Sequence, residues 1–70
     1  MRDVEISAVP IRLGQFLQVA GLAGGGGDAK GLLEAGAVTV NGRPESRRGA
    51  QLKGGDVVAV GEHRVRVVPA

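Results

Sequence analysis

The stretch that decides the fold is "AGAVTVNGRPESRRG", residues 35–49. Valines alternate with a threonine in residues 38–40, as expected for a half-buried strand. The Asn41-Gly42 pair that follows is a two-residue turn signal, because both residue types tolerate positive φ. Pro44 cannot donate a ladder hydrogen bond, so the chain after the turn is predicted to be irregular or to lie at a sheet edge.

The sequence C-terminal to this turn predicts a small antiparallel sheet. Residues 47–56, "RRGAQLKGGD", have a loop-like composition, with Leu52 as a buried anchor. "DVVAVG" and "HRVRVV" then read as two strands joined around "GEH". In the last strand Val65 and Val67 face one way, and the arginines that alternate with them face the other.

The sequence N-terminal to the turn predicts an edge strand and two short helices. Val4 and Ile6 alternate with polar residues, as in an edge strand. The first helix, ended by Gly21, has an apolar stripe made of Leu13, Phe16, Leu17 and Ala20. The second helix, ended by Gly36, has a stripe made of Ala29, Leu32 and Leu33. Neither helix is long enough to persist alone in water. The predicted fold is therefore α+β, with two short helices packed against a small antiparallel β-sheet.

The glycine-rich stretch "GLAGGGGDAKG", residues 21–31, connects the two predicted helices. A phosphate-binding Walker loop would follow a buried strand and place Gly-Lys directly before Ser or Thr. Here Lys30 follows an alanine, Gly31 stands in place of the hydroxyl residue, and an amphipathic helix precedes the glycines. The stretch is therefore interpreted as a helix–helix turn, with Asp28 at the start of the second helix.

Length and composition indicate one small domain, residues 1–70, with a core of Val, Leu and Ala. The chain has no cysteine, which excludes a disulfide framework and fits a reducing cytoplasm. Its N-terminus lacks the apolar region of a signal peptide, and no apolar run approaches the roughly 18 residues of a membrane span. We therefore expect a soluble cytoplasmic protein with no membrane partner.

Charge is distributed unevenly, although the formal net charge is only +2. The segment from Arg43 to Lys53 contains four basic residues and the single acid Glu45, whereas the N-terminal strand carries Asp3 and Glu5. This asymmetry indicates either a face that meets a polyanion or a solvated basic loop.

Residues suited to catalysis are sparse. His63 is the only histidine, and it lies in a predicted hairpin turn, where an exposed position is the expected one. The serines have no evident partner base, and no His, Cys and Asp cluster has metal-ligand spacing. Asp28, Glu34 and Asp56 each have an ordinary role, at a helix start, on an exposed helix face and in a turn before a strand. The sequence predicts no enzyme, no cofactor and no small-molecule substrate.

Taken together, the two helices, "GAVTVNG", the basic loop and "GGDVV" resemble the S4-type RNA-binding domain, or αL motif, over residues 13–60. The likeness is greatest to small free-standing bacterial members that carry "VNG" followed by "E-x-RRG". The resemblance implies RNA binding through a face that combines the second helix with the loop after "VNG".

Carried over position by position, the resemblance implies five RNA-binding residues, which are Lys30, Arg43, Arg47, Arg48 and Lys53. Lys30 stands where the family more often has arginine, so it would act as a point charge rather than as a planar fork. Gly25 stands where the family usually has a serine that caps the second helix, and glycine is only slightly worse than serine at such a position.

The near absence of aromatic side chains narrows the predicted ligand. Phe16 is the only aromatic residue of the sequence. Its helical spacing places it in the core, so no aromatic ring is available for base stacking. We expect a monomer that contacts the phosphates of structured RNA, ribosomal or tRNA-like. One alternative is an interaction module for an acidic or ribosomal partner, which charge cannot distinguish from RNA binding. A further alternative is a ubiquitin-like sulfur carrier, but that chemistry needs a C-terminal Gly-Gly where this chain has "VVPA".

Overall fold

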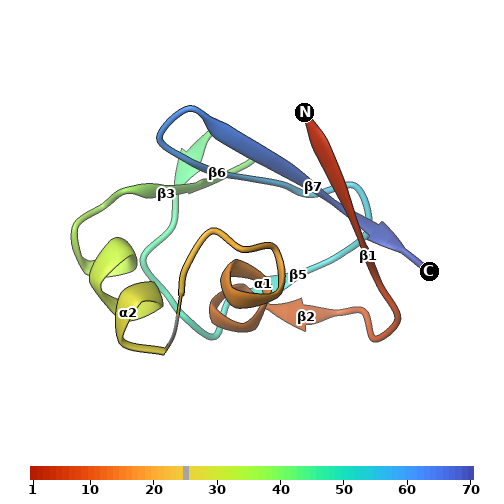
Figure 1. Cartoon of the computed structure of the whole chain (residues 1–70), viewed down its shortest axis with the longest axis horizontal. Helices are drawn as coiled ribbons and strands as arrows, with labels where there is room; N and C mark the ends of the chain where they lie inside the picture. Colours follow the sequence, from red (N-terminus) through yellow and green to blue (C-terminus); the bar gives the residue numbers. More distant parts are fainter. Residues whose placement is uncertain (25) are drawn as a thin grey trace.

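Two helices cover one face of a twisted sheet in the computed structural model, which describes residues 1–24 and 26–70 (Figure 1). Neither helix of the described chain is long and apolar enough to cross a membrane. The helices are α1 (Leu13–Val19) and α2 (Gly26–Glu34). The strands are β1 (Arg2–Ile6), β2 (Ile11–Arg12), β3 (Val38–Val40), β4 (Arg43–Pro44), β5 (Gln51–Leu52), β6 (Val57–Val60) and β7 (His63–Pro69).

The main sheet has the strand order β1-β7-β6-β3-β4, and the predicted α+β class is confirmed. The neighbours β7-β6, β6-β3 and β3-β4 are antiparallel, as expected. β1 and β7 differ, because they run parallel in a register from Arg2↔Val65 to Ile6↔Pro69. A parallel pair needs a long crossover connection, and here the connection is nearly the whole chain between the first strand and the last.

The Asn-Gly turn has the predicted conformation. Asn41 has φ 53° and Gly42 has φ 83°, so both central residues are in the left-handed region that a two-residue hairpin needs. Pro44 lies in β4 at the edge of the sheet, opposite Thr39, where its missing N–H interrupts no ladder. The edge position predicted for this segment is therefore confirmed.

The segment after the turn is more regular than its composition suggests. Instead of forming loop throughout, it contains β5, which pairs with β2 in a two-stranded antiparallel sheet, Ile11 opposite Leu52. Leu52 is 1% exposed, which confirms it as the buried anchor. Burial of the Leu52 side chain thus holds Gln51 and Leu52 in a strand, although the composition around them is typical of a loop.

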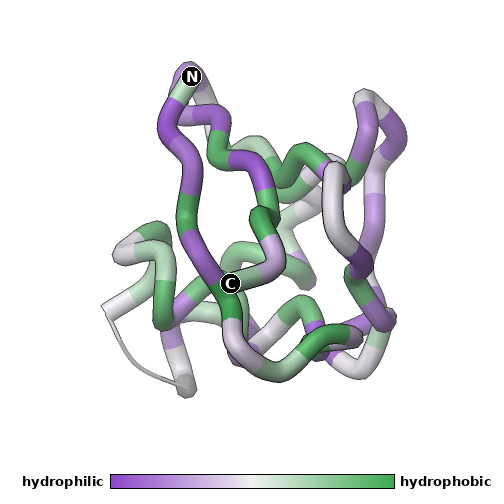
Figure 2. The backbone as a smooth tube through the Cα atoms, turned by 90° about the vertical axis from the view of Figure 1, so that its right-hand side faces the viewer, coloured by the Kyte–Doolittle hydropathy of each residue, from purple (hydrophilic) through white to green (hydrophobic). Residues whose placement is uncertain are grey.

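The core lies between the helices and the sheet. Both apolar stripes face it, except that Leu32 is only half-buried at its margin. Along β1 and β7, hydrophobic and hydrophilic residues alternate, as Figure 2 shows for the strands that begin at the N-terminus and end at the C-terminus. The core side chains are those of Ile6, Leu13, Phe16, Leu17, Ala20, Ala23, Ala29, Leu33, Val38, Leu52, Val58, Val65 and Val67.

Within residues 1–24 and 26–70, the opposite face of the sheet carries no helix (Figure 1). Thr39, Ala59 and Arg64 lie in one row across β3, β6 and β7 on this face. Their neighbours in the same strands, such as Val58 and Val65, point into the core.

Both helices end where the sequence predicts, with one residue between the last helical residue and the glycine, Gly21 or Gly36. Asp28 lies in the first turn of α2, and its carboxylate accepts a hydrogen bond from the backbone N–H of Gly24 (3.2 Å). This contact supports the predicted role of Asp28 at the helix start. Gly25, which would replace a capping serine, lies outside the described residues.

An exposed ion pair joins the parallel strands. The Arg66 guanidinium donates to both carboxylate oxygens of Asp3, at 3.1 and 2.9 Å. These hydrogen bonds lower the pKa of Asp3, so ionised Asp3 favours the folded state. The contribution is present above the pKa of Asp3 in the unfolded chain and is lost as the pH falls through its lower folded pKa.

The variant Asp3→Asn is therefore expected to be slightly less stable than the parent at neutral pH, and the difference is expected to vanish at a pH below the lowered pKa of Asp3 in the folded state, where aspartate is protonated in both states. Urea unfolding at the two pH values measures the difference. A stability difference that persists at the acidic pH would show that the ion pair is not its source.

Candidate nucleic-acid interface

The basic loop, residues 43–53 after the Asn-Gly turn, caps the first helix. The N–H of Leu13 donates to the carbonyl oxygen of Ala50 (2.8 Å), and the N–H of Gly14 donates to that of Arg48 (2.9 Å). Arg12, which precedes α1, makes no side-chain capping bond. Because the first N–H groups of a helix have no partner within it, the loop backbone replaces a capping side chain. Helix and loop are thereby held together.

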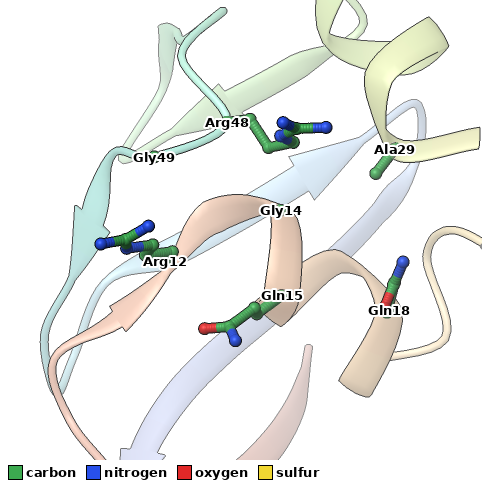
Figure 3. A pocket seen from close by; sticks show the side chains of 7 residues that line it. All are labelled: Arg12, Gly14, Gln15, Gln18, Ala29, Arg48 and Gly49. Carbon is green, nitrogen blue, oxygen red and sulfur yellow. The ribbon is translucent and has the colours of Figure 1, made fainter. Parts of the chain in front are cut away.

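Gly14 lets the Arg48 side chain lie against α1. Gly14 is buried, and a β-carbon at this position would overlap Cγ of Arg48. Figure 3 shows the Arg48 side chain extending across the first turn of α1 toward Ala29 of α2. A helical residue without a side chain thus positions the stem of this arginine. Its guanidinium lies where the loop and the two helices meet.

Two pockets meet at Arg48. The first has a volume of about 360 Å³, and Arg12, Gln15 and Arg48 are among the residues that line it (Figure 3). The second has a volume of about 270 Å³ and is lined in part by Lys30, Ser46 and Arg48. We call Arg12, Lys30 and Arg48 the basic cluster. Three separate segments of the chain contribute one cation each to it.

The five residues predicted from the sequence do not all lie at these pockets. The structure brings Lys30 and Arg48 together in the second pocket. Arg47 is next to Arg48 in the chain but lines neither pocket. Arg43 begins β4 at the sheet edge and Lys53 follows β5, and these two also line neither pocket. Lys30 and Arg48 are therefore the two members of the predicted set that share one of these pockets.

Sequence reasoning misses Arg12, Gln15 and Gln18. These residues recur at a spacing of three, so they follow one another along the polar side of α1, and all three line the first pocket. The only signal of them in the sequence is a helix face that carries one cation, two side-chain amides and no acidic residue. Such a face has the same composition as ordinary solvated surface, because the apolar stripe alone defines where the helix lies.

The two ends of the basic loop are fastened to one buried carboxylate. Asp56 is 8% exposed, and its Oδ1 accepts a hydrogen bond from the Asn41 side-chain amide (3.0 Å). Its Oδ2 accepts one from the backbone N–H of Lys53 (2.9 Å). The oxygen of the same Asn41 side chain accepts from the N–H of Val57 (2.9 Å). Asn41 and Asp56 therefore do more than form turns, because they fix where the loop begins and ends.

Two exposed ion pairs lie around the basic cluster. Lys30 is 3.9 Å from Glu34 one helical turn away. The Arg47 guanidinium donates to both carboxylate oxygens of Glu45, and these hydrogen bonds lower the pKa of Glu45 and raise that of Arg47. Exposed pairs of this kind are weak and screened by salt, so a phosphate can compete with either glutamate. Within the described chain, Arg48 has no salt bridge.

The acidic side chains and the histidine of the described chain lie apart from one another. Among residues 1–24 and 26–70, no group of three or more His, Asp or Glu side chains is placed to hold a metal ion. His63 is exposed, but it is the first residue of β7, opposite Val60, rather than part of the turn itself. The basic cluster is a set of cations at the junction of a loop and two helices.

Comparison with known proteins gives matches over most of the chain. A family model described as "S4 domain" matches residues 4–68. A Bacillus subtilis protein named "Probable ribosome maturation protein RlbA" is 44% identical over 57 residues, which cover 81% of this chain and 80% of that protein. The solution structure of YbcJ from E. coli, described as an αL motif involved in RNA binding, matches with a TM-score of 0.73 and 29% identity. That match covers 97% of this chain and 87% of YbcJ.

Proposed function

Since this chain belongs to the S4 domain family, we propose that it is a non-catalytic protein that binds structured RNA through the basic cluster. The observation that carries the proposal is that Arg48 lines two pockets, one together with Arg12 and the other together with Lys30. Two of these three residues follow from the αL pattern, and the third, Arg12, ends β2 directly before α1.

The chemistry of the three cations suits a phosphate backbone. Arg48 offers a planar fork that can hold a phosphate through two parallel hydrogen bonds, and its stem is positioned by Gly14. Lys30 is a mobile point charge on the neighbouring helix, 66% exposed at its side chain. Cations from three separate segments of the fold favour a ligand whose phosphates have a fixed spacing, such as a folded RNA, over a flexible acidic peptide.

The flanking basic residues extend the same contact surface. Arg43, Arg47 and Lys53 are exposed and lie in the segment that Asp56 holds at both ends. We assign them to phosphates on either side of the basic cluster. Glu45 would then lose its pairing with Arg47 when RNA binds.

The relatives suggest which RNA this is. The B. subtilis relative is named for ribosome maturation, and YbcJ is described as carrying a motif involved in RNA binding. We propose that the ligand is ribosomal RNA, bound in the cytoplasm by a monomer. Partners that remain after RNase treatment of a lysate would instead favour the interaction module.

Salt dependence is the simplest test of phosphate binding. With about five phosphate contacts, a plot of log K against log salt concentration should have a slope near −4. Fluorescence anisotropy of a labelled ribosomal RNA helix at several salt concentrations measures this slope. A flat response would contradict the proposal, because binding would then not depend on displaced counterions.

A further inference from the structure

A second groove adjoins the basic cluster across two glutamines. Gln15 and Gln18 line the pocket that holds Arg12 and Arg48, and they also line a larger cavity, of about 520 Å³, on their other side. This second cavity lies between α1 and the connection from β1 to β2. A ligand that reaches past the glutamines can therefore occupy both spaces.

The walls of this groove are aliphatic and accessible. They are built partly by Pro10, Ile11 and Val19. Val19 is 59% exposed and is one of three large apolar side chains that the described chain leaves exposed. Nearby Val9, at 38% exposed, is another. Apolar side chains at the margin of a polar, basic surface indicate contact with an apolar part of a ligand, such as the face of a nucleobase, rather than with phosphate.

The polar groups at the groove select among flat ligands. Each glutamine offers a carbonyl oxygen and an NH₂ group side by side, which matches the amino donor and ring-nitrogen acceptor of adenine. Glu5 also lines the groove, and its carboxylate disfavours phosphate but accepts a hydrogen bond from an amino group. Uracil presents no amino group, and cytosine offers less apolar surface to the aliphatic walls. Guanine presents two acceptors, N7 and O6, at the edge where adenine presents an acceptor and a donor, so it does not match the glutamine amide there.

We propose that this groove receives one unpaired adenine of the bound RNA, a proposal that rests on the function given above. The phosphates that flank the adenine lie at Arg12 and Arg48, and its base passes Gln15 and Gln18 into the groove. RNA-binding proteins often read bases at bulges and loops, where a base can leave the stack. The groove would make this protein prefer RNA helices that carry such a base.

The RNA side of the test uses hairpins that differ at one nucleotide. The four RNAs are a fully paired hairpin and the same hairpin with a single unpaired adenosine, uridine or purine riboside, the last lacking only the amino group. The adenosine bulge is expected to bind about tenfold more tightly than the paired hairpin. The uridine and purine riboside bulges should bind like the paired hairpin, since neither can donate an amino hydrogen bond.

The protein side uses the double variant Glu5→Ala, Val19→Ser, whose two positions line the groove but not the pocket of the basic cluster, with Lys30→Ala as the control. Both sites of the double variant are exposed, and circular dichroism verifies that the fold is retained. The double variant should bind the paired hairpin nearly as the parent does but lose the preference for adenosine. Lys30→Ala should weaken binding to all four RNAs by the same factor and keep the preference.

Two of the outcomes test the groove separately from the proposed function. Salt-dependent binding of all four hairpins with equal affinity overturns the adenine site and leaves RNA binding in place. A preference for adenosine that persists in the double variant also overturns it. Absence of binding to every hairpin overturns both proposals.

Discussion

Replacing Arg48 with glutamate is expected to lower the affinity for structured RNA by about 100-fold. Hydrogen bonds to charged groups contribute roughly 1.5–3 kcal/mol each, and every 1.4 kcal/mol or so is a factor of ten in affinity. Arg48 lies where two pockets meet, so reversing its charge removes a bidentate contact and repels neighbouring phosphates. The loss should be similar for RNAs of different sequence, because phosphate contacts carry no base information.

The matched control is Arg64→Glu, which makes the same change of charge on the sheet face that carries no helix. Arg64 is exposed, so the fold should be unaffected by it. Anisotropy titrations of both variants at one salt concentration separate a local contact from net charge. Equal losses for Arg48→Glu and Arg64→Glu would show that only the overall charge matters and that the basic cluster is not the binding site.

Replacing Asp56 with alanine is expected to destabilise the fold by about 2–3 kcal/mol, because two donors, the Asn41 amide and the Lys53 N–H, lose their acceptor in a partly buried place. For a domain of this size the whole stability is only about 4–10 kcal/mol. The melting temperature should therefore fall by roughly 10–20 °C.

The control for this variant is Glu62→Ala, which removes an exposed acid from the β6–β7 turn and so makes the same change of charge. Its stability should stay within about 0.5 kcal/mol of the parent. Calorimetry or thermal circular dichroism compares the two. If the two variants have the same melting temperature, the Asp56 carboxylate does not hold the ends of the basic loop.

Much of the fold is predictable because local patterns and burial agree. The helix stripe of α1, the positive φ of Asn41 and the alternation of Val65 and Val67 are each set by residues close in sequence, and each is confirmed. The parallel pairing of β1 with β7 is different, since alternation within a strand fixes which side faces the core but not which strand lies beside it.

In the candidate site, too, some residues follow from a sequence pattern and others depend on how the chain packs. Lys30 and Arg48 follow from the αL pattern, but their common pocket depends on Gly14, whose role only the packing of α1 against the loop makes clear. Arg12 and Gln18 carry no motif, and they become part of the site only because the loop backbone caps the helix that presents them.

The most direct test of RNA binding through the basic cluster is a titration of the isotope-labelled protein with a ribosomal RNA hairpin, followed through backbone amide chemical shifts. We expect the largest changes at the junction of α1, α2 and the basic loop, represented by Gly14, Lys30 and Arg48. The largest changes at Ala59 and Arg64, on the face of the sheet that carries no helix, would contradict this assignment.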